Sequence, residues 1–532
     1  MNLLEKTIGF FSPEKALKRA DARRKLQVVN NLVGSGSGYG RHGASYAKKS
    51  LMAWMSSGRN ADDDIVDSIE TLRGRSRDLY MGVPLATGAL KTVRTNVVGS
   101  GLLLNAQIDA KFLGLTDEQA QEWERNVERE WKLWAETVQC DVERRQNFYQ
   151  LQSLVLLSAL MSGDVFVTMP IIKRVGSVYD LRIGLIEADR VCNPNKADMV
   201  PNANVAGGVE VDSFGAVKAY WVAKHHPDSR VRSSVDATQK WTRVLAFGET
   251  TGRRNVLHIM CDVERPAQRR GVPLLAPVIE SLKQLGRYSE AELMAAVISG
   301  MFTVFVRSDN PDEGLDQMFN NSLVETVEPN SYELGNGAIV GLAPGEDVQF
   351  ANPGRPNTAF DGFVIAICRQ IGAALEIPYE LLVKNFTASY SASRASLLEA
   401  WKMFRMRREW LIGQFCQPVY EEWLTEAVGK GRIQAPGFFE DPAIKAAWCG
   451  ADWYGDAQGQ LDPLKEANAA KVRVEEGFST REREAAELTG MKYENIHAVR
   501  KREEAMRKAD GLSANAVASS PMSNEEVEEN EE

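Results

Sequence analysis

Residues 377–410 read IPYELLVKNFTASYSASRASLLEAWKMFRMRREW. A proline marks the end of one helix, and a loop of small hydroxyl-bearing residues with one lysine, one phenylalanine and one tyrosine follows. A long helix comes next. Between Lys384 and Trp410 there are six basic residues and two acids, so this segment has a net charge of about +4 in a chain that is acidic overall.

Four basic residues of the long helix fall within about a third of its circumference, because successive residues turn by about 100°. They are Arg394, Lys402, Arg405 and Arg408. Leu398 and Trp401 share this arc, so the face is not purely basic. It could face a channel or a neighbouring subunit, or it could pair with acids on an adjacent helix. The composition alone favours the pairing.

The flanking segments predict further helices and a small insertion. Helices are expected over Leu274–Met301 and Thr358–Leu375, and one long helix over Ser393–Val428 with Pro418 as a break. The insertion between the first two helices is rich in Asn, Gly, Pro and acids. Short strands are expected in it at Phe302–Arg307 and Gly337–Leu342.

The remaining segments predict an α+β protein. Ala61–Thr92 should be helical, Thr116 and Gln119 form a capping box, and a helix should follow Asn147. The stripe Trp123, Val127, Trp131 and Trp134 is typical of a core or a subunit interface. Period-two patterns predict strands at Asp164–Lys173, Val178–Glu187, Gly208–Val211, Val217–Lys224 and Asn255–Met260. Pro463–Arg507 should be helical, with a capping box at Ser479–Glu482.

The charge and the cysteines restrict the function. The formal charge is −9, and six glutamates stand among the last eight residues. A sequence-specific DNA binder usually carries a basic excess, so any contact with nucleic acid should be local and weak. The six cysteines form no C-x-x-C pair, which argues against a zinc site or a disulfide framework. The longest uncharged run, Leu293–Val306, is too short to span a bilayer, so no membrane partner is predicted.

Motifs for catalysis are missing from the sequence. Gly38–Gly43 fits G-x-G-x-x-G, but it follows a Gly/Ser hinge instead of a buried strand, which argues against a dinucleotide site. There is no P-loop, no G-x-S-x-G and no H-E-x-x-H. His225 and His226 precede a proline at a strand end, where a surface turn is expected in place of a metal pair. No catalytic, cofactor or metal site is predicted.

Several long segments resemble the lambda-like family of phage portal proteins, in the order in which that family has them. They lie between about Gly43 and Arg507 and read RHGASYAKKSLMAW, DDDIVDSIETLRGRSRDLYMGVPLATGALKTVRTNVVGSGL, GGVEVDSFGAVKAYWVAKHHP, LHIMCDVERPAQRRGVPLLAPVIESLKQLGRYSEAEL and IPYELLVKNFTASYSASRASLLEAW. The N-terminal helix and the acidic tail fall outside this resemblance.

The resemblance implies the portal fold, assembled as a ring that usually has twelve subunits. The implied parts are an N-terminal helix and hinge (1–42), an α/β wing (43–273), a stem helix (274–301), a β-rich clip (302–356), a second stem helix (357–382), a tunnel loop (383–392), a long tunnel helix (393–430), a wing return (431–462), a helical crown (463–510) and a disordered acidic tail (511–532).

The resemblance also implies a function and partners. The ring would occupy one capsid vertex in the virion, after assembly in the host cytoplasm, and would conduct double-stranded DNA without reading its sequence. Partners would be the large terminase subunit, major capsid and scaffold proteins, and head-completion, adaptor and tail proteins. The residues implied to face the DNA channel are Lys384, Asn385, Phe386, Thr387, Ser389, Tyr390 and Ser391. The basic arc described above would face the channel or a neighbouring subunit.

Two other interpretations stay open at this point. The chain could be a head–tail adaptor or a scaffold-interacting protein that never encloses DNA. The order of helix, insertion, helix and loop argues against this. It could also be an enzyme such as a nucleotide-dependent motor, but the missing P-loop argues against that class.

Overall fold

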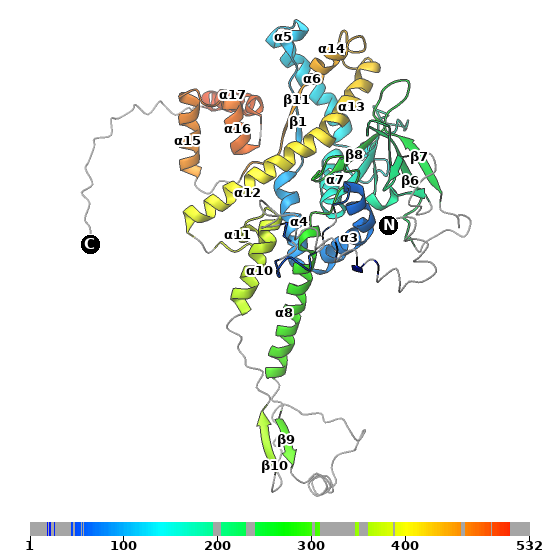
Figure 1. Cartoon of the computed structure of the whole chain (residues 1–532). Helices are drawn as coiled ribbons and strands as arrows, with labels where there is room; N and C mark the ends of the chain where they lie inside the picture. Colours follow the sequence, from blue (N-terminus) through cyan, green and yellow to red (C-terminus); the bar gives the residue numbers. More distant parts are fainter. Residues whose placement is uncertain are drawn as a thin grey trace, which may run out of the picture. The chain divides into compact units, whose positions relative to one another are not determined.

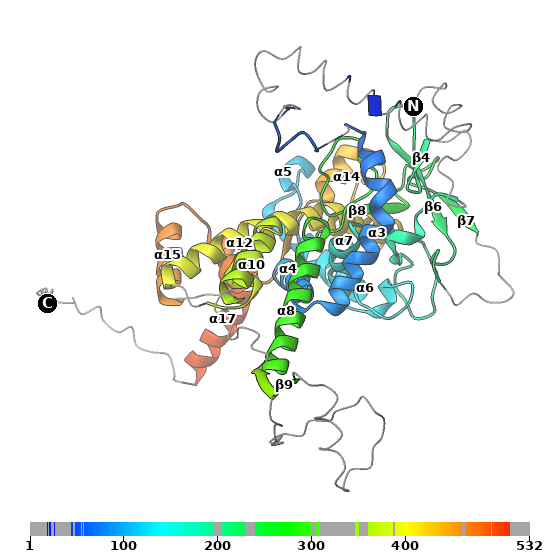
Figure 2. The same ribbon diagram turned by 60° about the horizontal axis from the view of Figure 1, so that its bottom comes forward.

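The computed structural model describes residues 58–194, 204–229, 240–300, 304–308, 346–350, 360–386, 389–458, 463–490 and 492–510, together with short pieces before residue 57 (Figures 1 and 2). The predicted N-terminal helix, its hinge and the acidic tail lie outside these residues, apart from four single positions before residue 30. The chain divides into two compact units, Met1–Asp64 and Ile65–Glu532. Nearly all of the helices and strands belong to the second unit.

The first helices are separated by a proline. A single helix over Ala61–Thr92 was predicted, and this is wrong, because the chain forms α3 (Ala61–Gly82) and α4 (Pro84–Val97). Val83 between them is extended, with φ −113° and ψ 110°. The ring of Pro84 disfavours a helical conformation for the residue before it. The next helices are α5 (Ala110–Leu113), α6 (Asp117–Ala135) and α7 (Phe148–Ser162).

The predicted tryptophan stripe lies in the core. Thr116 caps α6 with the predicted capping box, and α7 begins after Asn147, which caps it in the same way. Trp131 and Trp134 are buried, and the Trp131 ring lies 5.1 Å from the ring of Trp423 between centroids. The stripe therefore joins α6 to a helix almost 300 residues later in the chain.

The strands form small antiparallel sheets. Their bounds are β1 (Leu103–Ala106), β2 (Asp164–Thr168), β3 (Gly184–Ile186), β4 (Asn204–Ala206), β5 (Val209–Val211), β6 (Val217–Ala223), β7 (Trp241–Leu245), β8 (Val256–Met260), β9 (Val304–Ser308), β10 (Glu346–Phe350) and β11 (Ala451–Tyr454). The sheet orders are β3-β2-β8, β4-β5-β6-β7, β1-β11 and β10-β9. All pairings between described strands are antiparallel, and the predicted α+β class is confirmed. Short 3-10 turns lie at Val138–Cys140, Ala188–Arg190 and Ala276–Val278.

Two helices flank the β9–β10 hairpin along the chain. They are α8 (Ile279–Gly300) and α10 (Phe360–Ala374), and both figures show them side by side (Figures 1 and 2). The Tyr288 ring on α8 contacts Phe360 and Phe363 on α10, with centroids 5.4 and 5.0 Å apart. The strand predicted at Gly337–Leu342 lies outside the described residues.

The long helix starts earlier than predicted and contains a π-helical turn. After α11 (Tyr379–Leu382) the chain forms α12 (Tyr390–Leu411), the π-helical turn Ile412–Cys416 and α13 (Gln417–Gly429), which Figure 1 shows as one continuous rod. The predicted start at Ser393 is wrong, because an earlier serine caps the helix. The expected break at Pro418 takes the form of the widened turn directly before it. A short helix, α14 (Pro442–Trp448), follows and leads into β11.

Three helices form the C-terminal segment, namely α15 (Pro463–Glu475), α16 (Arg481–Thr489) and α17 (Tyr493–Ala509). The predicted capping box at Ser479–Glu482 is wrong. Thr480 caps α16 instead, and its hydroxyl accepts from the backbone N–H of Arg483 at 3.2 Å. Arg473 donates to both carboxylate oxygens of Glu484 at 2.8 and 2.6 Å, which joins α15 to α16. Within the described residues, no helix has the length and apolar character needed to cross a membrane.

Candidate functional site

The predicted loop begins with a tight turn that exposes Lys384, Asn385 and Phe386. Lys384 follows α11 with φ 55°, in the left-handed region. The backbone N–H of Asn385 donates to the carbonyl of Glu380 at 3.0 Å, which is the bond that closes a Schellman turn. Glycine usually takes this position, because a Cβ there costs about 1 kcal/mol. The turn directs the lysine and the phenylalanine away from the core, and Phe386 is 49% exposed.

The rest of the predicted loop is short. Ser389 caps α12, and its hydroxyl accepts from the backbone N–H of Ala392 at 3.4 Å. Tyr390 and Ser391 are therefore the first helical residues, and their side chains lie outside the description. Thr387 also lies outside it. Of the seven predicted loop residues, the structure thus places Lys384, Asn385, Phe386 and Ser389 with their side chains, and all four are exposed.

The residues of the predicted basic face have different partners. Arg394 lies 3.8 Å from a carboxylate oxygen of Glu466 on α15, and Arg405 lies 3.7 Å from one of Glu487 on α16. Lys402 pairs with Glu399 on its own helix at 2.7 Å. The acid-pairing interpretation thus describes the contacts of Arg394 and Arg405 within this chain.

Arg408 is part of the fold. Its guanidinium donates to the backbone carbonyls of Val97, Asn96 and Asp456 at 2.9, 3.1 and 3.0 Å. It also lies 5.6 Å from the centre of the Trp401 ring. Burial lowers the pKa of Arg408. This residue joins α12 to the end of α4 and to the segment after β11.

Arg407 was not predicted, and it is the most buried charge on α12. Its Nη1 lies 3.1 Å from the Cys261 sulfur and 3.4 Å from a carboxylate oxygen of Asp262, and Nη2 lies 3.9 Å from one of Glu376. Glu376 itself occupies a left-handed turn after α10, with φ 58°. Arg407 therefore joins α12 to the end of β8 and to the turn after α10.

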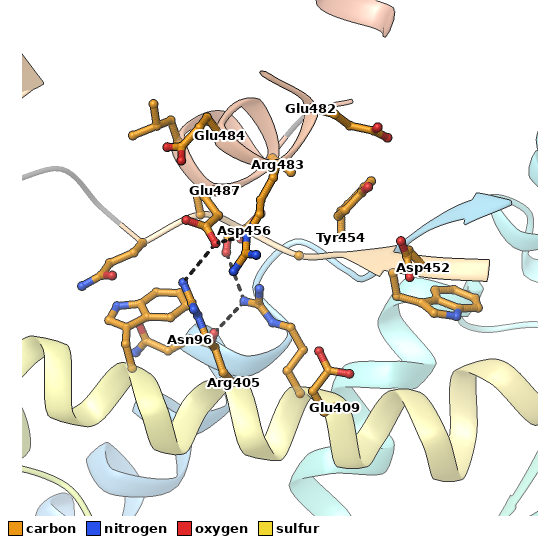
Figure 3. A pocket seen from close by; sticks show the side chains of 18 of the residues that line it. Asn96, Arg405, Glu409, Asp452, Tyr454, Asp456, Glu482, Arg483, Glu484 and Glu487 are labelled. Carbon is orange, nitrogen blue, oxygen red and sulfur yellow. Dashed lines mark hydrogen bonds and ion pairs between the residues drawn. The ribbon is translucent and has the colours of Figure 1, made fainter. Parts of the chain in front are cut away.

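A hollow lies between α12 and the C-terminal helices (Figure 3). Its volume is about 1040 Å³. Side chains of α12, of β11 with the residues after it, and of α15 and α16 line it. Figure 3 shows Arg405 rising from α12 towards Glu487, with Arg483 beside them. Acidic and basic side chains both line this hollow, so its charge favours neither an anionic nor a cationic ligand.

A buried charge cluster lies at the start of β2. Asp164 is fully buried and accepts from Arg73 at 2.7 Å, from Arg270 at 2.7 and 3.1 Å, and from the backbone N–H of Gly271 at 3.0 Å. His258 Nε2 lies 3.3 Å from the same carboxylate. Burial alone would raise the pKa of Asp164, but Arg270 and Arg73 hold it well below its usual range. Burial lowers the pKa of His258.

This cluster connects several segments of the fold. Arg73 also donates to the carbonyl of Ser162 at 2.8 Å, and Arg270 donates to the carbonyls of Val191 and Ala188 at 2.5 and 2.8 Å. The guanidinium groups thus join α3, the end of α7 and two loops around one carboxylate. Their donors are largely occupied by the protein, which leaves little to bind a substrate.

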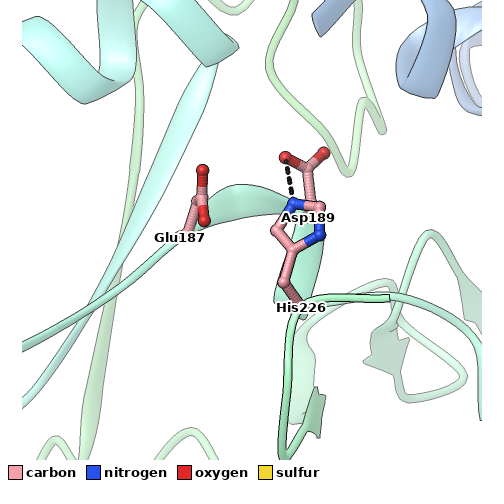
Figure 4. A group of neighbouring side chains, drawn as sticks. All are labelled: Glu187, Asp189 and His226. Atoms are coloured by element: carbon pink, nitrogen blue, oxygen red, sulfur yellow. Dashed lines mark ion pairs between the residues drawn. The ribbon is translucent and has the colours of Figure 1, made fainter. Parts of the chain in front are cut away.

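A possible metal-ligand group lies beside this cluster and comprises Glu187, Asp189 and His226 (Figure 4). Two arginines already neutralise its carboxylates. Arg77 contacts both acids, and Arg73 lies 3.6 Å from Asp189. His226 begins a turn, in which its carbonyl accepts from the backbone N–H of Ser229 at 3.0 Å, as predicted for a surface turn. Guanidinium groups on the carboxylates oppose a cation, so this group is an ion-pair network.

The buried cysteines offer no reactive thiolate. All six are free, and five of them are buried. Burial raises the pKa of Cys140, Cys261 and Cys449 to about 12, so these thiols stay protonated at neutral pH.

The comparison with known families shows which protein family the chain belongs to. The sequence model of the family described as phage portal protein, lambda family, matches residues 47–408, which is well over half of the chain. The chain belongs to this family. It is a structural, non-enzymatic family of head–tail connectors, so the prediction that the chain is not an enzyme is confirmed.

Three curated relatives carry the same description. Portal protein B of Escherichia phage lambda is 26% identical over 518 residues, which cover 94% of each chain. The portal protein of Escherichia phage N15 is 25% identical over 518 residues, with the same coverage. The probable portal protein of Halomonas phage phiHAP-1 is 25% identical over 425 residues, 78% of this chain and 76% of that one.

Solved structures with a similar chain include necks of gene transfer agent particles. One is the neck of the native particle computed with C12 symmetry, with a TM-score of 0.40, 13% identity, and coverage of 79% of this chain and 92% of that chain. Another is the neck of the empty particle computed with C6 symmetry, with a TM-score of 0.46, 12% identity, and coverage of 83% and 98%. At these TM-scores the likeness adds nothing to the family match.

The sequence pattern missed the residues whose partners lie far along the chain. Arg407 lies about 100° around the helix from Arg408, outside the basic arc, and nothing in the local sequence indicates its partners. Asp164 reads as an ordinary first residue of a strand, yet its partners are 91 and 106 residues away.

Replacing Asp164 with asparagine should strongly destabilise this portal-family chain. The change removes the charge that compensates two buried arginines, and the loss of one partner of a buried ion pair costs about 3–5 kcal/mol. Urea unfolding should show this as a lower transition midpoint. D78N is the matched control, because Asp78 lies on the exposed side of α3. Equal midpoints for D164N and wild type would contradict the structural role of the cluster.

The stability should also fall in mild acid because of His258. The unfolded chain protonates this histidine near the usual pKa of 6.5, whereas burial lowers the pKa of the folded form. The unfolded state thus binds more protons below about pH 6.5, and stability falls as the pH drops through this range. Urea midpoints measured at about pH 5 and 7.5 should differ less for H258Q than for wild type. H497Q, at an exposed position of α17, should keep the wild-type difference.

Proposed function

We propose that this chain forms a closed homo-oligomeric ring at the unique capsid vertex and conducts double-stranded DNA during packaging and ejection. The observation that carries the proposal is the exposed turn Lys384–Phe386, held between α11 and a long helix in a chain of the portal family. A ring would bring one lysine per subunit to the same level of the channel. Twelve subunits are expected from the family resemblance.

The charge balance supports a conduit. Duplex DNA carries about one charge per 1.7 Å of its axis, and a strongly basic wall would bind it by counterion release and hold it in place. The chain is acidic overall, with a formal charge of −9. Lys384 supplies a local charge, while Asn385 and Ser389 offer polar groups for weak contacts with phosphates that do not depend on base sequence.

Exposed apolar side chains on the paired helices support self-assembly. Leu293 and Met294 on α8 are 66% and 58% exposed, and Phe363 on α10 is 50% exposed. Exposed large apolar side chains on two adjacent helices favour an interaction surface there. In a ring, the next copy of the chain would cover them through a head-to-tail contact, which closes on itself when the rotation allows.

The predicted parts remain assignments within this proposal. Residues 43–273 and 431–462 would form the wing, α8 and α10 the stem, 302–356 the clip, α12 with α13 the tunnel helix, and α15–α17 the crown. The large terminase subunit would dock during packaging, followed by head-completion, adaptor and tail proteins. Capsid and scaffold proteins would contact the ring during assembly in the host cytoplasm.

A head–tail adaptor that never encloses DNA is the alternative. Family membership over residues 47–408 disfavours it. An affinity pull-down of the cognate large terminase subunit separates the two proposals. Retention of the terminase by assembled protein supports the portal, and retention of tail components alone supports the adaptor.

Electron microscopy of the purified full-length chain should show closed rings with an axial hole. The double variant L293E/M294E should reduce the ring fraction, because charges on α8 would face the neighbouring subunit. F214E is the matched control, since Phe214 is 93% exposed at a hairpin tip of the β5–β6 turn. A chain that stays monomeric under all assembly conditions would overturn the ring.

Packaging should depend on the exposed turn. The double variant K384G/F386A lacks the lysine charge and the phenyl ring of Phe386. Glycine at position 384 keeps the left-handed turn without strain. Rings should form normally, and filled heads should fall by about tenfold or more, because every subunit loses its phosphate contact together. K384R should retain packaging, and K132A removes an exposed lysine of α6 as a control. Normal numbers of DNA-filled heads with K384G/F386A would contradict a role of this loop in packaging.

A further inference from the structure

Acids of the C-terminal segment cover two arginines of α12. Arg394 faces Glu466 on α15 at 3.8 Å. Arg405 faces Glu487 on α16 at 3.7 Å (Figure 3). All four carriers of these charges lie in one chain. The carboxylates of Glu466 and Glu487 therefore occupy the positions beside the two guanidinium groups where an external anion would bind.

Both ion pairs are of the kind that a competing anion can displace. Their distances exceed those of close charge-assisted hydrogen bonds, and Arg405 is 57% exposed at its side chain. Exposed pairs contribute little to stability and are screened by salt. Glu487 also accepts from Arg483 on its own helix at 3.3 Å, so it keeps a partner when Arg405 is released.

The space between α12 and the helices α15 and α16 is a cavity and is not filled by side chains. The cavity of about 1040 Å³ separates α12 from α15 and α16, and Leu398 on α12 remains 47% exposed. Few apolar contacts would have to break if α15 and α16 moved away from α12. The C-terminal segment has a separate attachment, because Lys492 at the start of α17 pairs with Glu128 on α6. It would therefore open while it stays attached.

We propose that Arg394, Lys402 and Arg405 form a second binding site for the phosphate backbone of double-stranded DNA, masked by Glu466 and Glu487. This inference rests on the proposed function and deepens it, since it names a further DNA contact and the element that controls it. Arg394 and Arg405 are eleven residues apart, about 16 Å along the helix axis. That span covers several phosphates of a duplex.

The exchange needs no chemistry beyond ion pairing. Phosphates replace the two carboxylates, counterions leave the DNA, and α15 and α16 lose their contact with α12. Lys402 already projects into solvent, with 75% of its side chain exposed, and would receive the first contact. Arg408 takes no part, because its guanidinium is bound to three backbone carbonyls. DNA occupancy would thus be coupled to the release of the C-terminal helices.

The test is DNA binding by the full-length chain, measured by fluorescence anisotropy with a duplex of about 30 base pairs of random sequence. E466Q/E487Q should bind about two- to thirtyfold more tightly than wild type, because two exposed ion pairs no longer compete. The salt dependence should become steeper by about two phosphates per subunit. Adding R394Q/R405Q to this variant should remove the gain.

The matched control is E475Q/E476Q, which removes two glutamates from the end of α15, where Glu475 pairs with Lys471 of the same helix. Three outcomes would overturn the masked site: no gain in E466Q/E487Q, an equal gain in the control, or a gain that survives R394Q/R405Q. The K384G/F386A change should leave the gain intact. If K384G/F386A packages DNA normally, that result counts against the proposed DNA conduit. The anisotropy measurements with E466Q/E487Q would still decide whether the masked site exists.

Discussion

The placement of α12 depends on two neighbouring arginines whose guanidinium groups are bound inside the chain. Arg407 contacts Cys261, Asp262 and Glu376, while Arg408 donates to backbone carbonyls at the end of α4 and after β11. Together they hold the helix to elements that precede and follow it by dozens to hundreds of residues. The exposed turn lies between α11 and α12, so its position depends on how both helices are held as well as on its own hydrogen bond to Glu380.

The basic residues around this helix therefore have three different roles. Arg407 and Arg408 are anchors, Arg394 and Arg405 are paired at the surface, and Lys384 stands in the exposed turn. Composition treats all of them as one positive segment. Physical chemistry separates them, because a buried guanidinium with several acceptors has little left for a ligand, whereas a partly exposed pair at 3.7 or 3.8 Å exchanges readily. Within the described part of α12, the basic residues therefore already have partners in the chain.

Local patterns predicted those elements whose causes are local. The capping residues Thr116 and Asn147 and the tryptophan stripe were predicted correctly, because spacing within one helix decides them. The start of α12 was missed because the segment offers Ser389, Ser391 and Ser393 as caps, and only the preceding turn selects the first. The Asp164 cluster and Arg407 could not be predicted, since nearly all of their partners are 91 or more residues away and only the fold brings them together.

The turn at Lys384 shows how backbone and function can be connected. A residue with a Cβ occupies a left-handed position that costs about 1 kcal/mol and that glycine would fill without cost. Stability alone would favour glycine there, and Glu376 poses the same problem eight residues earlier. For Glu376 the structure supplies a reason within the chain, because its carboxylate faces Arg407. Lys384 instead has an exposed side chain, and no ion pair is found for it within the described residues.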